Sequence, residues 1–327
     1  MTPLEAIRNR ISPELDRLNK HISDSLRSDN ELMNRVIDGY LESKGKQIRP
    51  VLVLLSARLF AGAVTDRAIR AAASVEMLHN ASLIHDDVVD CSDKRRGLPT
   101  INNVWDNHIA VLVGDFFVSS SLKEAITTCD LRIVGALASL GRELSVGEMD
   151  QIYNARFHHL TEDGYFTVIA RKTASLFVAC VEMGAYAVGV ADDDPRLDAL
   201  RDFTRRLGLC FQIKDDIFDY FDEGRVGKPT GNDLREGKVT LPLLYALTAS
   251  SHPRREEMAE LARHEELTAD EIATLIAFAK EAGGIDYAYA TMERLRNEAS
   301  ALTAAIGNNR EAEALLSLLD FIITRDN

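Results

Sequence analysis

The sequence has 327 residues, of which 46% are hydrophobic and 27% are charged, so the chain can bury a sizeable core without disulfides or a structural metal. This composition excludes disordered and fibrous proteins. The 38 Lys and Arg residues against 51 Asp and Glu give a net charge of −13, which argues against a broad nucleic-acid-binding surface and predicts that nucleic acid is not a partner.

The termini and the cysteines indicate the compartment. The first 14 residues carry Glu5, Arg8, Arg10 and Glu14 in place of a continuous apolar core, so we expect no secretory signal. The longest apolar stretch, 173–191, contains Glu182 near its middle and is therefore predicted to be a buried helix and not a transmembrane segment. Four dispersed cysteines predict small core side chains in a reducing, cytoplasmic setting: Cys91, Cys129, Cys180 and Cys210.

Apolar residues recur at spacings of three and four from Leu32 almost to Ile323, which predicts an all-α fold. No Pro-rich or Gly-rich linker divides the chain, so we expect one domain over residues 1–327. In chain order, helices are predicted near 31–43, 50–61, 66–90, 104–127, 131–157, 163–190, 196–222 and 239–249, with four more beyond Pro253.

The first candidate site lies at the end of the predicted helix 66–90. Asp86 and Asp90 are four residues apart and share one helix face, which continues backward through Ser82 and His79. Like charges one turn apart are unfavourable, and so are carboxylates at the partially negative C-terminal end of a helix. Binding of a divalent cation explains both features, because Mg²⁺ prefers oxygen ligands and is typically bound by carboxylates together with substrate phosphate oxygens.

The second candidate site repeats this design. Asp215 and Asp219 share a face with Gln212 near the end of the predicted helix 196–222. A single such cluster reads more readily as an acidic helix end in water, but two copies, each followed by a Gly-containing basic loop, favour a shared role in binding a diphosphate through Mg²⁺. By contrast, the acids at 192–194 precede Pro195, and helix capping explains them without a functional role.

A diphosphate also needs cationic partners. Lys46 and Arg49 stand at the start of an apolar helix, where free backbone N–H groups already favour phosphate. Five further Arg and Lys residues are candidates. Each one alone would be typical of a solvated surface, but as a group they indicate an anionic substrate. These candidates are Arg95, Arg96, Lys172, Lys228 and Lys238. For His79, a core position and a phosphate-binding role both remain open.

Together these segments resemble the trans-isoprenyl diphosphate synthases, also called polyprenyl synthases. The resemblance rests on seven motifs in the order of the family, at 45–50, 83–90, 95–97, 114–117, 172–173, 211–219 and 227–229. It implies an all-α helical bundle of the isoprenoid-synthase type around a deep central cavity. It also implies a homodimer, with both aspartate motifs facing each other across the mouth of the cavity.

The resemblance further implies a role for each motif residue. Asp86, Asp90 and Asp215 would bind Mg²⁺ that holds an allylic diphosphate, with Asp87, Asp216 and Asp219 as neighbours or further ligands. The same diphosphate would contact Arg95, Lys172 and Lys238, and Lys228 is a further candidate. The diphosphate of isopentenyl diphosphate would contact Lys46, Arg49, His79 and Arg96, while Thr173 and Gln212 would orient oxygen dipoles toward an allylic cation.

The chain length of the product depends on the space beside the first aspartate helix. In short-chain members of the family, aromatic residues stand four and five residues before the first aspartate, where this sequence has Ser82 and Ala81. Leu78 and Ser74 lie further along the same side. We therefore expect a long-chain synthase that extends farnesyl or geranylgeranyl diphosphate, such as one making quinone side chains. Alternatively, Ala81 and Ser82 are helix-packing residues and another helix limits the product.

Three other readings remain open. The first is a short-chain synthase that makes farnesyl or geranylgeranyl diphosphate. The second is a class I terpene cyclase or a head-to-head synthase, which would have no use for the second diphosphate site formed by Lys46, Arg49 and Arg96. The third is a non-catalytic partner subunit of a heteromeric synthase, against which the two intact aspartate clusters argue.

Overall fold

The computed structural model describes residues 1–42, 45–95, 97–221, 230–264 and 266–325. Within these residues the strands are limited to β1 (Lys94–Arg95) and β2 (Leu98–Pro99), a short antiparallel pair in which Lys94 lies opposite Pro99. The rest of the regular structure is helical, which confirms the predicted all-α fold.

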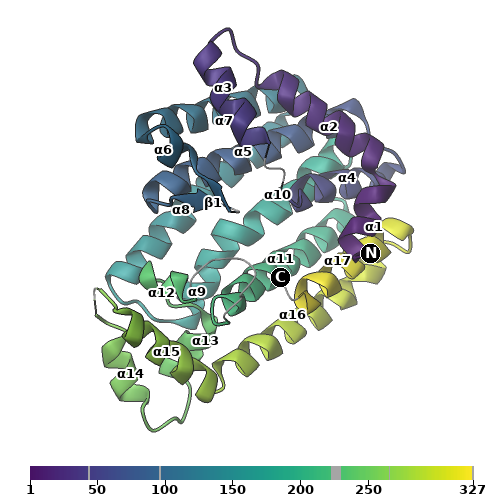
Figure 1. Ribbon diagram of the computed structural model, residues 1–327. Coiled ribbons are helices and arrows are strands. Elements are labelled where there is room, and N and C mark those ends of the chain that lie inside the picture. Colours follow the sequence, from purple (N-terminus) through teal and green to yellow (C-terminus); the bar gives the residue numbers. More distant parts are fainter. Residues whose placement is uncertain (43–44, 96, 222–229, 265, 326–327) are drawn as a thin grey trace. The chain divides into compact units, whose positions relative to one another are not determined.

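The helices follow one another along the chain as in Figure 1. Their bounds are α1 Pro3–Arg10, α2 Ser12–Ser25, α3 Glu31–Leu41, α4 Ile48–Ala61, α5 Asp66–Val89, α6 Ile101–Val104, α7 Asn107–Thr127, α8 Leu131–Arg156, α9 Glu162–Ile169, α10 Ser175–Ala187, α11 Pro195–Phe218, α12 Asn232–Arg235, α13 Leu241–Thr248, α14 Arg255–Leu261, α15 Ala269–Glu281, α16 Gly284–Ile306 and α17 Arg310–Thr324. A π-helical turn, η1 (Ala170–Ala174), separates α9 from α10.

Most predicted ranges agree with these helices, including the four after Pro253 within residues 254–264 and 266–325. The single helix predicted at 163–190 is wrong in one respect, because η1 interrupts it at Lys172 and Thr173. A π turn shifts the helical spacing of apolar residues by only one residue. The spacing in the sequence therefore does not reveal it. Helices α1 and α2 were not predicted from the sequence.

The chain forms two compact units that interleave along the sequence. Unit 1 consists of Met1–Arg142, Leu176–Asp202 and Leu302–Leu318, and unit 2 consists of Glu143–Ser175, Phe203–Ala301 and Leu319–Asn327. The boundaries fall inside α8, α11, α16 and α17 and near the start of α10. The single functional domain expected over 1–327 stays a prediction.

Unit 1 is organised around α4, whose residues 51–55 are completely buried. Helix α4 is apolar on every side, as expected for a helix at the centre of a unit. It lies very close to α10, because a Cβ atom added at Gly184 would lie 2.3 Å from the carbonyl oxygen of Val53. The hydroxyl of Ser56 donates to the carbonyl oxygen of Val181 at 2.6 Å. This close approach packs the middle of α4 against α10.

Helices α5 and α7 form the other main contact of unit 1. Two reciprocal hydrogen bonds join them, since Ser74 Oγ donates to the Ser121 carbonyl at 2.9 Å and Ser121 Oγ donates to the Ser74 carbonyl at 2.7 Å. His85 lies against Val111 and Gly114, so the two helices run antiparallel. This packing determines where the C-terminal end of α5, with its aspartates, is held.

Unit 2 has its own apolar core beneath the end of α11. Tyr220 packs there with side chains from α13, α14 and α15 that are almost fully buried, among them Leu243, Met258, Leu275 and Phe278. The phenolic hydroxyl of Tyr220 accepts a hydrogen bond from the backbone N–H of Leu243 at 3.2 Å. This anchors the chain immediately after the second aspartate cluster.

The prediction that all four cysteines are core side chains is wrong for two of them. Cys180 and Cys210 are buried, as predicted, but Cys91 and Cys129 are exposed. Both exposed cysteines adopt positive φ angles, of 50° and 56°, directly after helices, so they stand in turns at helix ends and not in apolar interiors.

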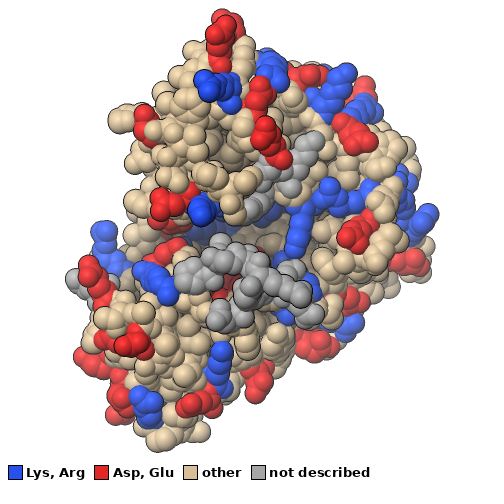
Figure 2. Space-filling model, viewed as in Figure 1, with Lys and Arg blue, Asp and Glu red and all other residues tan. Residues whose placement is uncertain are grey.

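Acidic and basic side chains both occur on the face of the molecule shown in Figure 2.

Among the described helices, none combines the length and the apolar composition needed to cross a bilayer.

Candidate active site

The first aspartate cluster lies at the C-terminal end of α5 in unit 1. This helix starts at an N-cap, where the Thr65 hydroxyl accepts a hydrogen bond from the Ala68 backbone N–H, and it ends at Val89, with Asp90 as its C-cap. Asp86 is half-buried and Asp90 is exposed, whereas Asp87 is only 4% exposed. The two aspartates predicted as metal ligands thus reach solvent, and the one between them faces the protein.

Asp87 is held by Arg95 from β1. The Nε and Nη2 atoms of Arg95 both lie 2.8 Å from Asp87 Oδ1. The side chain of Asn102 donates to the Asp87 and Ser92 carbonyl oxygens at 3.4 and 3.1 Å. Arg95, a candidate cation for the diphosphate, thus lies against the first aspartate cluster. Arg96 lies outside the described residues.

His85 joins this helix end to α7. Its Nε2 atom lies 3.3 Å from the Val111 carbonyl oxygen and 3.6 Å from Asp115 Oδ1. A Cβ atom at Gly114 would lie 2.2 Å from the same ring nitrogen, so the ring occupies the space that only glycine leaves open. This explains the Gly114–Asp115 pair of the fourth motif, because Gly114 leaves room for the His85 ring and Asp115 lies beside it.

Two of the predicted isopentenyl diphosphate residues, Lys46 and Arg49, lie at the start of α4. Lys46 is exposed and its carbonyl oxygen accepts a hydrogen bond from Arg8 at 2.5 Å. The guanidinium carbon of Arg49 lies 5.8 Å from the ring centroid of Phe177, and cation–π attraction helps to hold it. His79, on α5, is 7% exposed. The structure thus places Lys46 and Arg49 at the start of α4 and His79 in a buried position on α5.

The predicted chain-length residues lie along α5. Ala81 and Ser74 are fully buried, and the Ser74 hydroxyl is part of the contact with α7. Ser82 and Leu78 are partly exposed, and the Ser82 hydroxyl donates to the His79 carbonyl oxygen at 2.9 Å. Ser74 thus packs against α7, and the choice between a chain-length role and a packing role for Ala81 and Ser82 stays a prediction.

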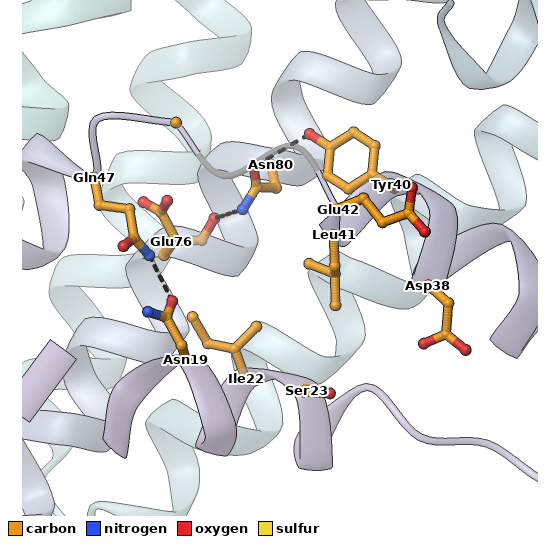
Figure 3. Close-up of a pocket in the computed structure, with 11 residues that line it drawn as sticks. Asn19, Ile22, Ser23, Asp38, Tyr40, Leu41, Glu42, Gln47, Glu76 and Asn80 are labelled. Atoms are coloured by element: carbon orange, nitrogen blue, oxygen red, sulfur yellow. Dashed lines mark hydrogen bonds between the residues drawn. The ribbon is translucent and has the colours of Figure 1, made fainter. Parts of the chain in front are cut away.

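A cavity of about 270 Å³ lies beside the loop that leads into α4, and Figure 3 shows its lining. Gln47 Nε2 donates to Asn19 Oδ1 at 2.8 Å, and the Tyr40 hydroxyl donates to Asn80 Oδ1 at 3.1 Å. The lining includes three carboxylates, of Asp38, Glu42 and Glu76. Because these acids repel an anion, this cavity does not fit a diphosphate.

The second aspartate cluster lies at the C-terminal end of α11, in unit 2. Asp215 is half-buried and its Oδ1 atom is paired with Arg325, near the C-terminus. The guanidinium carbon of Arg325 lies 4.6 Å from the ring centroid of Phe211 and 5.4 Å from that of Phe218. This arginine was not predicted, since it stands alone in a tail that carries no motif.

Asp216 is the buried member of the second cluster, at 4% exposed. Its Oδ2 atom accepts a hydrogen bond from the Tyr165 hydroxyl at 2.6 Å, and its Oδ1 atom accepts one from Gln212 Nε2 at 2.8 Å. Gln212 Oε1 in turn accepts a hydrogen bond from the Thr173 hydroxyl at 2.7 Å. The predicted pair Thr173 and Gln212 is thus joined to Asp216, and Tyr165 was missed.

Asp219 is engaged by the backbone of α12. Its two carboxylate oxygens accept hydrogen bonds from the N–H groups of Asn232 at 2.9 Å and Asp233 at 3.0 Å. The third aspartate of this cluster therefore anchors the chain beyond 230, which differs from the exposed position of Asp90.

Burial raises the pKa values of two acidic side chains in this region. Burial raises the pKa of Asp216 to about 7, and the neighbouring charges of Asp215 and Asp219 add to the rise. Burial likewise raises the pKa of Asp233 well above its ordinary value, with the charges of Asp216 and Asp219 contributing. The interior of this cluster thus holds protons more strongly than exposed carboxyls do.

Two remaining predicted cations of unit 2 that the structure describes each have an acidic partner. Lys172, on η1, is paired with Glu148 of α8, and Lys238 is paired with Glu236. A Cβ atom at Gly147 would lie 3.0 Å from the Lys172 backbone nitrogen, so α8 supports the π turn closely. Isolated π turns occur frequently at functional sites. Lys228 lies outside the described residues.

Among the described residues, no three His, Cys, Asp or Glu side chains gather closely enough to form a metal site by themselves. Mg²⁺ does not require such a group, because one or two carboxylates together with waters and substrate phosphate oxygens commonly bind it. Asp86, Asp90 and Asp215 offer hard oxygen donors that reach solvent, so each cluster fits such an ion.

Comparison with known proteins agrees with these motifs. Residues 30–278 match the Polyprenyl synthetase family. The chain is 31% identical over 324 residues to octaprenyl diphosphate synthase of Escherichia coli and 34% identical over 324 residues to heptaprenyl diphosphate synthase component 2 of Geobacillus stearothermophilus, each match covering 99% of both chains. The crystal structure of geranylgeranyl pyrophosphate synthase from Bacteroides thetaiotaomicron is 39% identical, with a TM-score of 0.84 over 99% of both chains.

These matches extend over both units and over every predicted motif. Prenyl synthases of this kind act on isoprenoid diphosphates and depend on a metal ion. The chain belongs to the polyprenyl synthetase family and is a prenyltransferase.

Proposed function

We propose that the protein is a Mg²⁺-dependent trans-polyprenyl diphosphate synthase. It condenses isopentenyl diphosphate head-to-tail with an allylic diphosphate, either farnesyl or geranylgeranyl diphosphate. One observation carries this proposal: α5 and α11 both end with a first aspartate that reaches solvent and a second that is buried and hydrogen-bonded, namely Asp86 and Asp87, and Asp215 and Asp216.

Asp86, Asp90 and Asp215 are the proposed metal ligands. Mg²⁺ bound there would offset the negative charge that grows on the departing pyrophosphate. The buried aspartates have a different role, since Asp87 holds Arg95 and Asp216 holds Gln212. The clusters therefore combine accessible ligands with fixed supports.

The cations are proposed to bind the substrate diphosphates. Arg95, Lys172 and Lys238 bind the allylic diphosphate, and each is already held by a carboxylate in the structure. A guanidinium group has five N–H donors, and the contacts of Arg95 with Asp87 involve two of its nitrogens. Lys46, Arg49 and His79 bind isopentenyl diphosphate, together with Arg96.

The reaction has three steps. The allylic C–O bond breaks and the bonding electrons leave with pyrophosphate. The double bond of isopentenyl diphosphate then attacks the allylic cation and forms the new C–C bond. Loss of a proton, with pyrophosphate as the base, restores a double bond in an allylic diphosphate five carbons longer. Holding the two substrates together and excluding water are essential, because water would capture the cation.

We propose a long-chain product because Ala81 and Ser82, five and four residues before Asp86, are small and not aromatic. The octaprenyl and heptaprenyl synthases among the relatives favour this proposal, and the geranylgeranyl synthase keeps a short-chain product as the alternative. The relative named as a component also keeps open a requirement for a second subunit. Assay of the purified chain alone separates an independent enzyme from one that needs such a partner.

We propose that the enzyme is a homodimer. Helix α7 presents large apolar side chains to solvent, with Leu112, Leu122 and Ile126 exposed by 60%, 44% and 57%. Leu131 at the start of α8 is 86% exposed. Such a face is typical of a protein interface. Sedimentation of the wild type should give twice the chain mass of 36.2 kDa, and Leu122→Glu should shift it toward the monomer.

The activity test supplies the purified chain with Mg²⁺, farnesyl diphosphate and radiolabelled isopentenyl diphosphate. The proposal predicts label in a butanol-extractable prenyl diphosphate. Label that remains entirely in isopentenyl diphosphate with either allylic primer, and with no added subunit, would contradict an independent synthase. The cytoplasmic location expected from the sequence stays a prediction.

A further inference from the structure

A chain of hydrogen bonds in unit 2 leads from a buried tyrosine to Thr173. Tyr165 on α9 donates to Asp216 on α11 at 2.6 Å, Gln212 on α11 donates to the other oxygen of Asp216 at 2.8 Å, and Thr173 on η1 donates to Gln212 at 2.7 Å. Three separate elements of one unit thus meet in a single ordered network.

The chemistry of the groups sets the direction of every bond in this network. In its ionised form the carboxylate of Asp216 accepts from both sides, so Gln212 then presents its NH₂ group to Asp216 and its carbonyl oxygen to Thr173. The hydroxyl hydrogen of Thr173 then points to Gln212, and the lone pairs of the Thr173 oxygen point elsewhere. Reversal of the Gln212 amide would place its oxygen against the carboxylate, which is unfavourable.

We propose that Tyr165 is a positioning residue for prenyl transfer, and that it acts through Asp216 and Gln212 to fix the direction of the Thr173 hydroxyl dipole. The inference rests on the proposed function and on the role that the family resemblance implies for Thr173, whose oxygen dipole would be oriented toward the developing allylic cation. A dipole that is already oriented stabilises the charge without reorganisation during the reaction. Tyr165 stands at the end of this network opposite Thr173.

The tyrosine hydroxyl can be removed without removing the ring. Tyr165 is 8% exposed and its ring packs edge-on against Phe166 with a centroid distance of 5.4 Å. A phenylalanine at position 165 keeps this contact and removes only the donor to Asp216. Asp216 can then turn away from its present orientation, and Gln212 loses the partner that holds its amide in one direction.

The test is a double-mutant cycle of Tyr165→Phe and Thr173→Val, with kcat and KM measured for both substrates. We expect Tyr165→Phe to lower kcat about tenfold and to change each KM less than about twofold, because an oriented dipole acts on the transition state. In the Thr173→Val background the same change should have almost no effect on kcat, because the hydroxyl that it orients is absent. Thr173→Ser retains the hydroxyl and should restore the sensitivity to Tyr165→Phe.

Tyr287→Phe is the matched control. Its hydroxyl also bonds a carboxylate in unit 2, that of Glu162 at 2.9 Å, and its ring is held by stacking on Tyr245. It should leave kcat unchanged in both the wild-type and the Thr173→Val background. An equal fall in kcat for Tyr165→Phe with and without the Thr173 hydroxyl, or a fall confined to KM, would overturn the inference.

The same cycle measured as free energy of unfolding in urea separates this inference from the proposed function. Coupling between positions 165 and 173 supports the network whatever the enzyme makes, and strictly additive effects would contradict it. A wild type that forms no prenyl product contradicts the proposed function and with it the catalytic role of Tyr165.

Discussion

The imidazole ring of His85 lies on Gly114, in the space where any other residue would carry its Cβ atom. This contact connects α5 to α7 one residue before Asp86. The Gly114–Asp115 motif thus has a structural reason, which is the placement of the helix end that carries the first aspartate cluster.

Gly114→Ala should therefore lower stability by about 1–3 kcal/mol, because the new methyl group displaces the His85 ring. It should also lower activity, since the end of α5 moves with the ring. Urea unfolding and initial rates measure the two effects.

The control for this variant is the His85→Ala background. There the clash is absent, and because alanine favours a helix over glycine by about 1 kcal/mol, the same Gly114→Ala change should stabilise the protein. Equal destabilisation in both backgrounds would show that the contact with His85 is not the cause.

Asp86→Ala and Asp215→Ala should each lower the rate of isopentenyl diphosphate incorporation by about a hundredfold or more, because each removes a proposed metal ligand. Asp193→Ala, in the acidic run before α11, provides the control and should retain full activity. A loss of only a few-fold in either of the first two variants would refute the roles assigned to them.

Ala81→Phe and Ser82→Phe should shorten the product, because an aromatic side chain would occupy space beside the first cluster. Ala81 is fully buried and Ser82 is partly exposed, so Ser82→Phe is the variant more easily accommodated. Chromatography of the dephosphorylated products measures the chain length. An unchanged distribution of product chain lengths for both variants would show that another helix limits the product.

The four cysteines should divide into two reactive and two protected thiols. Cys91 and Cys129 are exposed. Burial raises the pKa of Cys210 to about 12 and raises that of Cys180 further, which suppresses the reactive thiolate. Titration with a disulfide reagent should therefore detect two thiols in the native protein and four in urea. Four fast-reacting thiols in the native state would contradict the burial of Cys180 and Cys210.

The sequence was sufficient to predict the elements whose signal is periodic or repeated. Apolar spacing predicted the long helices, and the duplicated aspartate pattern located the ends of α5 and α11. It could not separate Asp86 from Asp87 by burial, because adjacent residues differ in environment only once the helix is packed. The partners Tyr165, Glu148 and Arg325 are single residues brought close by the fold from distant positions, and no local pattern marks them.

The most direct test of the account is mass spectrometry of the product that the purified chain makes from isopentenyl diphosphate and farnesyl diphosphate. With Mg²⁺ present, we expect a series of prenyl diphosphates spaced by one five-carbon unit and ending at a long-chain species, and no such series after chelation of the metal. A cyclised hydrocarbon, or unchanged farnesyl diphosphate beside intact isopentenyl diphosphate, would contradict head-to-tail synthesis by this protein.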